Sequence, residues 1–115
     1  MKILILGAGR MGHGAAFDLI HNSPGVESVT VADFDLKKAE AVAEQVGTDR
    51  ITAHHVDAGN QSDVARLMAH HDAAISCVNY WYNESLSRAA IDTNTHLCDL
   101  GGNNYVVDSQ LALDE

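Results

Sequence analysis

The sequence predicts an α/β domain built on a doubly wound parallel sheet. Five short apolar segments recur, and their starts lie about 22 to 26 residues apart, the length of a strand plus a crossover helix. Between them, apolar residues change to a helical spacing. Right-handed crossovers then predict the strand order 3-2-1-4-5. A complete sheet of this kind usually has a sixth strand, so we expect a fragment of a larger protein, cut before that strand.

The elements follow from these patterns in order. The expected strands are residues 3–6, 29–32, 51–56, 73–78 and 96–100. The expected apolar faces of the first two helices are Met11, Ala15, Ala16, Leu19 and Ile20, then Leu36, Ala39, Val42, Ala43 and Val46. The expected faces of the next two are Val64, Leu67 and Met68, then Tyr82, Leu86, Ala89 and Ala90. We expect Gly47 to end the second helix, Asn60 to cap the third, and residues 105–115 to begin a further helix.

Composition excludes several classes of protein. The 115 residues fit one domain, and a net charge of −9 argues against a nucleic-acid partner. No apolar stretch approaches the ~18 residues of a membrane span, and the start lacks a signal peptide. Cys77 and Cys98 lie in apolar runs, which suits reduced, buried thiols. We therefore expect a cytoplasmic protein with no membrane partner.

A glycine motif follows the first apolar run. Residues Gly7-Ala8-Gly9-Arg10-Met11-Gly12 lie between a strand and a helix, as in Rossmann-type dinucleotide-binding domains. Gly7 allows the tight turn, Gly9 lets the backbone approach phosphate, and Gly12 lets the helix lie against the strand. The free N–H groups at the helix start favour an anion despite the acidic composition. This loop is the predicted pyrophosphate site.

An acidic residue ends the second strand. Asp33 lies 21 residues after Gly12, where a carboxylate can accept hydrogen bonds from the adenosine ribose, and Phe34 follows it at the same edge. The same charge would repel a 2′-phosphate, so the expected cofactor is NAD rather than NADP. Lys37 and Lys38 are alternative phosphate partners, although a helix would point them mostly to solvent. Asp33 could instead cap the following helix.

The next two strand ends complete the predicted site. Asp57 and Ala58 lie where the adenine ring is expected, and Asp57 either accepts from the adenine amino group or caps the next helix. Val78 and Asn79 are candidates for the cofactor's central ribose. The aromatic residues 80–82 either pack in a core or against another domain, or form a wall near the nicotinamide.

No catalytic or metal site is predicted. The adjacent histidine pairs at 54–55 and 70–71 diverge on a strand or helix, and no further ligand completes a metal spacing. There is no Gly-x-Ser-x-Gly motif, and neither cysteine has an activating base visible in the sequence.

Several stretches together resemble one family. MKILILGAGRMG, VTVADFDLKKAEAVAEQ, VDAG, VNYWYNE and HLCDLGG are similar to the N-terminal NAD(P)-binding domain of the saccharopine dehydrogenase family, and most of all to its lysine 6-dehydrogenases. The resemblance covers nearly all of the chain. It implies a homodimeric oxidoreductase that passes hydride between a substrate amine or imine carbon and a nicotinamide cofactor.

The resemblance also implies roles for single residues. It assigns Gly7, Gly9, Arg10, Met11 and Gly12 to the pyrophosphate, Asp33 to the adenosine ribose, Asp57 and Ala58 to the adenine edge, and Asp99 to the nicotinamide side. In this family a second domain supplies most of the amino-acid substrate site, so the domain alone is expected to be inactive. Residues 79–81 depart from the proline-containing loop of many saccharopine reductases, which leaves saccharopine, lysine and carboxynorspermidine open as substrates.

The alternative is a nucleotide-sensing module of the kind that gates potassium transporters. Such modules share the glycine loop and the acidic residue after the second strand. They usually show a Gly-Asp-Ala turn and lack HLCDLGG, whereas here Val56 precedes Asp57 and that element is present. These differences favour the dehydrogenase interpretation.

Overall fold

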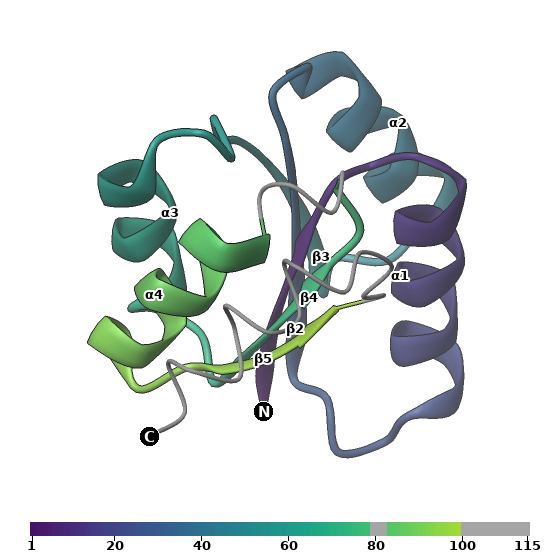
Figure 1. Ribbon diagram of the computed structural model, residues 1–115. Helices are drawn as coiled ribbons and strands as arrows, with labels where there is room; N and C mark the ends of the chain where they lie inside the picture. Colours follow the sequence, from purple (N-terminus) through teal and green to yellow (C-terminus); the bar gives the residue numbers. More distant parts are fainter. Residues whose placement is uncertain (79–82, 100–115) are drawn as a thin grey trace.

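The fold is a five-stranded parallel sheet between two layers of helices (Figure 1). The computed structural model describes residues 1–78 and 83–99. The strands are β1 (Lys2–Leu6), β2 (Ser28–Asp33), β3 (Ile51–His55), β4 (Ala73–Ser76) and β5 (His96–Asp99). The helices are α1 (Arg10–Asn22), α2 (Leu36–Val46), α3 (Gln61–Met68) and α4 (Asn83–Thr93). The order β3-β2-β1-β4-β5 confirms the prediction; the expected helix at 105–115 and Tyr82 lie outside the described residues.

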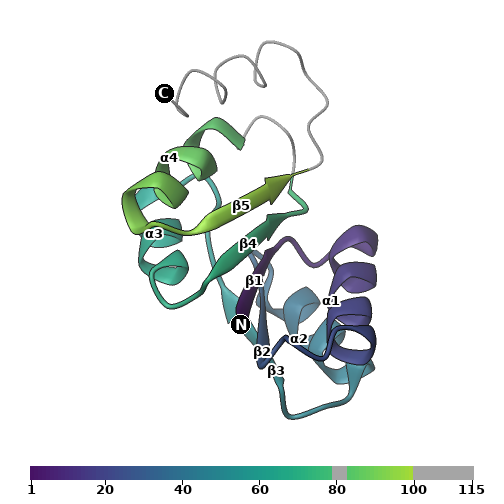
Figure 2. The same cartoon turned by 90° about the horizontal axis from the view of Figure 1, so that it is seen from below.

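Alternation along the strands divides the interior into two cores. On β1, Ile3 and Ile5 belong to the core beneath α1 and α2, whereas Leu4 and Leu6 belong to the core beneath α3 and α4. Figures 1 and 2 show these helix pairs on opposite faces of the sheet. Successive strand residues point to opposite faces, so an apolar run such as that of β1 is expected where both faces are covered.

The helix ends follow the sequence signals. The Asp35 side chain accepts from the N–H of Lys37 at 3.1 Å and so caps α2, and Asn60 caps α3 by accepting from the N–H of Asp63 at 3.1 Å. Gly47 ends α2 in the left-handed region at φ 76°. The prediction of a buried position is wrong for two residues. Met11 is 58% exposed and Leu36 is 40% exposed, because each lies in the first turn of its helix, beyond the strands.

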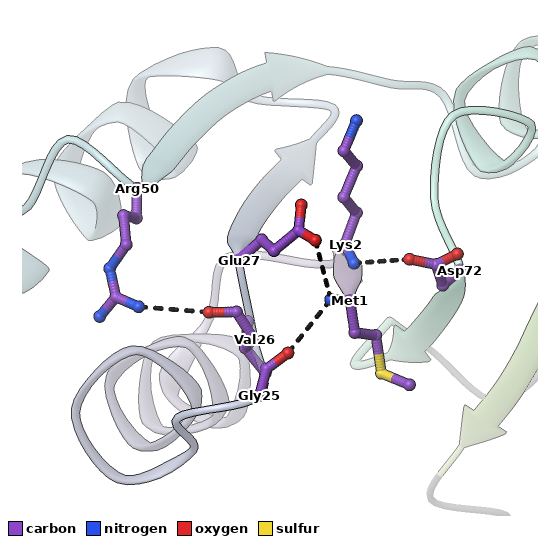
Figure 3. A network of polar contacts seen from close by, with 7 residues as sticks. All are labelled: Met1, Lys2, Gly25, Val26, Glu27, Arg50 and Asp72. Carbon is purple, nitrogen blue, oxygen red and sulfur yellow. Dashed lines mark hydrogen bonds and ion pairs between the residues drawn. The ribbon is translucent and has the colours of Figure 1, made fainter.

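Polar contacts tie the strands together at their amino ends. Figure 3 shows Met1, Lys2, Gly25, Val26, Glu27, Arg50 and Asp72. The Lys2 N–H donates to the Asp72 carboxylate at 2.7 Å, which joins the starts of β1 and β4. The Arg50 guanidinium donates to the carbonyls of Val26 at 3.2 Å and Ile20 at 2.6 Å, joining the start of β3 to the end of α1. The carboxyl ends of the strands lie at the other edge of the sheet.

The helices of the described ranges are short. The longest of them, α1, has 13 residues. Within residues 1–78 and 83–99, no helix has both the length and the apolar composition needed to cross a membrane.

Candidate nucleotide-binding site

A cavity of about 470 Å³ opens at the carboxyl ends of β1 to β4. In a doubly wound sheet this edge is where ligands bind. The residues that line it are Gly7, Gly9, Ala32, Asp33, Phe34, Lys38, Val56, Asp57, Ala58, Cys77 and Val78. Seven of the predicted binding residues are therefore brought together, from the ends of four strands that are far apart in the sequence.

The glycine loop excludes side chains at two positions. Gly7 has φ +104°, and a Cβ there would lie 2.7 Å from the carbonyl oxygen of Cys77. A Cβ on Gly12 would collide with the carbonyl oxygen of Gly7. No heavy atom lies within 4 Å of the Cβ position of Gly9, so this backbone faces open space. The loop is a closely packed turn whose middle is open to a ligand.

Helix α1 begins at this loop without a capping side chain. Its N-cap residue is Gly9, and among the described residues neither a side-chain cap nor an acidic residue occupies its first turn. The first N–H groups of a helix have no intrahelical partner and carry a partial positive charge. Arg10 and Met11, both predicted phosphate ligands, are exposed in this turn and do not line the cavity. Gly12, the third predicted ligand of the turn, is buried and does not line the cavity either. The turn can bind an anion through its backbone.

The Asp33 carboxylate contacts the protein's own backbone. Its Oδ2 accepts from the N–H of Ala8 at 2.8 Å, and its Oδ1 accepts from the N–H of Asp35 at 2.8 Å. It does not cap α2, because Asp35 does so. Asp33 still lines the cavity, so its charge faces any ligand that binds there.

The end of β3 supplies a second carboxylate. Asp57 accepts from the N–H of Gly59 at 2.9 Å within a turn, and its own N–H donates to the Asp63 carboxylate at 3.2 Å. The helix-cap alternative for Asp57 is wrong because Asn60 holds that position. Asp57 and Ala58 both line the cavity.

An aromatic pair borders the same edge. Phe34 is 71% exposed and lines the cavity, and its ring lies 5.6 Å from that of His55, tilted by 48°. His55 ends β3 directly opposite Asp33 of β2. The sequence pointed to His55 only as a possible metal ligand and not as a neighbour of Phe34. The register of β2 and β3 would have pointed to it, but register is not visible in one strand alone.

Lys38 is exposed, as expected from its place on a helix, and it also lines the cavity. Lys38 is the third residue of α2, and the first turn of this helix starts at the carboxyl edge of the sheet. Ala32, Val56 and Cys77 were missed, while Asn79 and the aromatic residues 80–82 lie outside the described residues.

The cavity wall offers little for covalent chemistry. Burial, with a smaller contribution from Cys98, raises the pKa of the Cys77 thiol, which keeps it protonated and a poor nucleophile at neutral pH. Cys98 is exposed rather than buried, because β5 is the edge strand of the described sheet. No group of three or more potential metal ligands occurs in residues 1–78 and 83–99. The site is suited to holding a ligand.

Comparison with known proteins identifies the family. Residues 3–115 match the family model described as the saccharopine dehydrogenase NADP binding domain. The chain belongs to the saccharopine dehydrogenase family. The saccharopine dehydrogenase [NADP(+), L-glutamate-forming] of Schizosaccharomyces pombe is 28% identical over 114 residues, which are 99% of this chain and 24% of that protein. The chain thus spans about a quarter of this curated member of the saccharopine dehydrogenase family.

Solved structures share the fold. Apo saccharopine dehydrogenase (L-Glu forming) from Saccharomyces cerevisiae superposes with a TM-score of 0.78 and 24% identity, over 93% of this chain and 23% of that one. A wide-type short-chain dehydrogenase/reductase from Veillonella parvula in complex with NADP gives 0.69 and 16%, over 85% and 46%. These likenesses establish a Rossmann-type domain.

The family corrects the expected cofactor. Our prediction of NAD is wrong: the matching model describes an NADP-binding domain, and the relative from S. pombe is named for NADP(+). The prediction rested on an Asp33 carboxylate that accepts hydrogen bonds from the adenosine ribose. In the structure both of its oxygens already accept a backbone N–H, and Lys38 is among the residues that line the cavity.

Proposed function

We propose that this domain binds NADP in the cavity at the carboxyl ends of β1 to β4. The observation that carries the proposal is the glycine loop, in which Gly7 and Gly12 exclude side chains and the uncapped start of α1 faces the cavity edge. The pyrophosphate would accept from the N–H groups at 10–12, as anions do at helix N-termini. Met11 and Arg10 contribute backbone there, and Gly9 leaves room for the phosphate.

The residues that line the cavity support a place for each other part of NADP. Asp57 and Ala58 would border the adenine, with Phe34 against the ring. Val78 and Asn79 would contact the central ribose. Lys38 would attract the 2′-phosphate: at ~4 Å and an effective dielectric of about 20, two unit charges interact by about 4 kcal/mol before screening.

For the whole protein we propose an oxidoreductase acting on a substrate amine or imine carbon. NADP, when bound, supplies the hydride acceptor or donor, and this chain's residues bind and orient it. The proposal rests on the dehydrogenases among its relatives. Because the chain spans 24% of such a relative, we propose that another domain supplies the amino-acid substrate site and that this domain alone is inactive. Lysine, saccharopine and carboxynorspermidine remain candidate substrates; the homodimer and cytoplasmic location stay predictions.

A titration of the purified chain tests the cofactor. NADP⁺ at about 100 times its dissociation constant is expected to stabilise the fold by about 2.7 kcal/mol, which raises the melting temperature by several degrees. No shift at millimolar NADP⁺ would contradict the proposal.

A matched pair of lysine variants tests the 2′-phosphate contact. Lys38→Gln is expected to weaken NADP⁺ binding about tenfold and to leave NAD⁺ binding unchanged, because only NADP⁺ carries the 2′-phosphate. Lys37→Gln, on the neighbouring exposed residue, controls for the loss of one positive charge. Equal losses in the two variants would show that Lys38 makes no specific contact.

A further inference from the structure

The Asp33 carboxylate lines the cavity and also accepts a hydrogen bond from the glycine loop. Its carboxylate reaches back across 25 residues to the N–H of Ala8, which is 8% exposed and lies between Gly7 and Gly9. The second carboxylate oxygen holds the N–H of Asp35. One side chain thus fixes both the turn that follows β1 and the turn that follows β2.

The same turn is attached to β2 a second time. The N–H of Gly7 donates to the carbonyl of Ala32 at 2.7 Å. Two successive peptide groups of the loop are therefore held by successive residues of β2. This fixes the loop peptides while Gly7 adopts φ +104°. A buried N–H such as that of Ala8 is costly to leave unpaired, and a hydrogen bond to a charged acceptor is stronger than one to a neutral group.

We propose that Asp33 is a positioning residue for the phosphate-binding loop, and that it does not select between NADP and NAD through the adenosine ribose. The inference rests on the proposed nucleotide site. Through Ala8, the carboxylate sets the path of the backbone from Gly7 into the start of α1, where the pyrophosphate would bind. Both dinucleotides carry the same pyrophosphate, so loss of Asp33 weakens both alike.

A ribose ligand would behave differently. A carboxylate that accepts from the ribose hydroxyls opposes a 2′-phosphate, so its neutralisation strengthens NADP⁺ binding and weakens NAD⁺ binding. Adenosine 2′-monophosphate separates the two roles, because it carries the ribose and the 2′-phosphate but no pyrophosphate. The affinity of adenosine 2′-monophosphate changes if Asp33 contacts the ribose directly, and it does not depend on the position of the glycine loop.

The test compares Asp33→Asn with Asp35→Asn. Asparagine at 33 keeps one acceptor oxygen for two N–H donors, whereas Asp35 is exposed, contacts the N–H of Lys37 and does not touch the loop. In Asp33→Asn, the dissociation constants of NADP⁺ and NAD⁺ are expected to rise together by about tenfold, with that of adenosine 2′-monophosphate within about twofold of wild type. Asp35→Asn is expected to leave NAD⁺ binding within about twofold of wild type.

Amide hydrogen exchange gives a readout that general destabilisation does not reproduce. In Asp33→Asn, exchange at Ala8 is expected to accelerate more than exchange at Leu4 in the centre of β1. In the wild-type chain, Ala8 is expected to remain protected when NADP⁺ binds, which tests the idea even if the variant does not fold.

Two results would overturn this role for Asp33. One is a tenfold change in the ratio of the NADP⁺ and NAD⁺ dissociation constants in Asp33→Asn; the other is faster exchange at Ala8 when NADP⁺ binds to the wild type. A wild-type chain that binds neither dinucleotide would overturn the proposed function itself.

Discussion

At the scale of single residues, Gly12 has the least room of the glycines in the described loop. A methyl group there would meet the carbonyl oxygen of Gly7, which belongs to a turn held by β2 and cannot move away cheaply. The Ile5 side chain lies 3.6 Å from the same Cβ position. The close approach of α1 to β1 therefore depends on a hydrogen atom at this position.

Gly12→Ala is expected to lower the free energy of unfolding by about 1 to 3 kcal/mol, the usual cost of overpacking. It is also expected to weaken NADP⁺ binding, since α1 must shift from the loop. Gly14→Ala is the control: it lies in the same helix with no heavy atom within 4 Å of its Cβ, so it is expected to stabilise by about 0.5 to 1 kcal/mol. Urea denaturation of both variants checks this; equal effects would contradict the steric argument.

The residues of the site differ in how well the sequence predicted them. The glycines and Asp33 have a fixed spacing from a strand and a helix start, so local patterns place them at the cavity. The contacts of Asp33 with Ala8 and of Phe34 with His55 join residues that are far apart in the sequence. Such contacts depend on register and side-chain rotamers, which one sequence does not reveal. The incorrect prediction of NAD arose for this reason, because it took no account of the hydrogen bonds from Ala8 and Asp35 to the Asp33 carboxylate.

At the scale of elements, His71 links α3 to β2. Its Nδ1 lies 2.8 Å from the carbonyl oxygen of Leu67 and its Nε2 lies 2.8 Å from the hydroxyl of Thr30. With Nδ1–H donating to the carbonyl, Nε2 can accept from the hydroxyl only when the imidazole is neutral. Burial is the main cause that lowers the pKa of His71 below its ordinary value of 6.5. The hydrogen bond to Leu67 raises this pKa, His70 and Lys2 lower it, and Asp72 raises it.

This link predicts a pH-dependent stability. Because the folded-state pKa of His71 is lowered, the unfolded chain takes up a proton more readily than the folded chain. The stabilisation is complete above about pH 6.5 and is lost as the pH falls through the folded-state pKa. His71→Gln is expected to flatten the decline of the urea midpoint between about pH 7.5 and about pH 5. His70→Gln, at the exposed neighbour, is expected to keep most of this decline, because burial lowers the pKa of His71 more than His70 does. An unchanged decline in His71→Gln would contradict this role.

Helix ends were predicted better than helix faces. Asn60 and Gly47 perform the capping roles expected of them, since a cap depends on residues within one turn. Met11 and Leu36 fit a helical stripe but are exposed, because periodicity does not reveal how far a helix extends beyond the sheet. The crossover lengths, by contrast, were enough to predict all five strands and their order.

At the scale of the whole molecule, one sheet serves two cores. Met68 is fully buried in the core beneath α3 and α4, and Ile20 is 4% exposed in the core beneath α1 and α2. Alternate residues of β1 belong to each core. If one core loses its packing, β1 is released on that face, and the same strand can then no longer support the core on its other face. The two cores are therefore expected to unfold together.

Met68→Ala and Ile20→Ala are each expected to lower the free energy of unfolding by about 2 to 5 kcal/mol, the range for such truncations in a core. Each variant should show a single transition in urea, with the same midpoint by circular dichroism and by NMR signals from both cores. Phe17→Ala, at an exposed position of α1, is the control and should change stability little. Separate midpoints for the two cores would show that the sheet does not couple them.

The network at the amino ends of the strands has a consequence for protein engineering. Lys2, Asp72 and Arg50 fix the strand starts at one edge, while the cavity lies at the other. Positions 34 and 58 can therefore be randomised in a library with little cost to folding, and variants with altered nucleotide preference can be sought in it, whereas Val78 packs against the core and is kept. Asp33 is the position to leave constant in such a library, because its carboxylate holds the scaffold as well as facing the ligand.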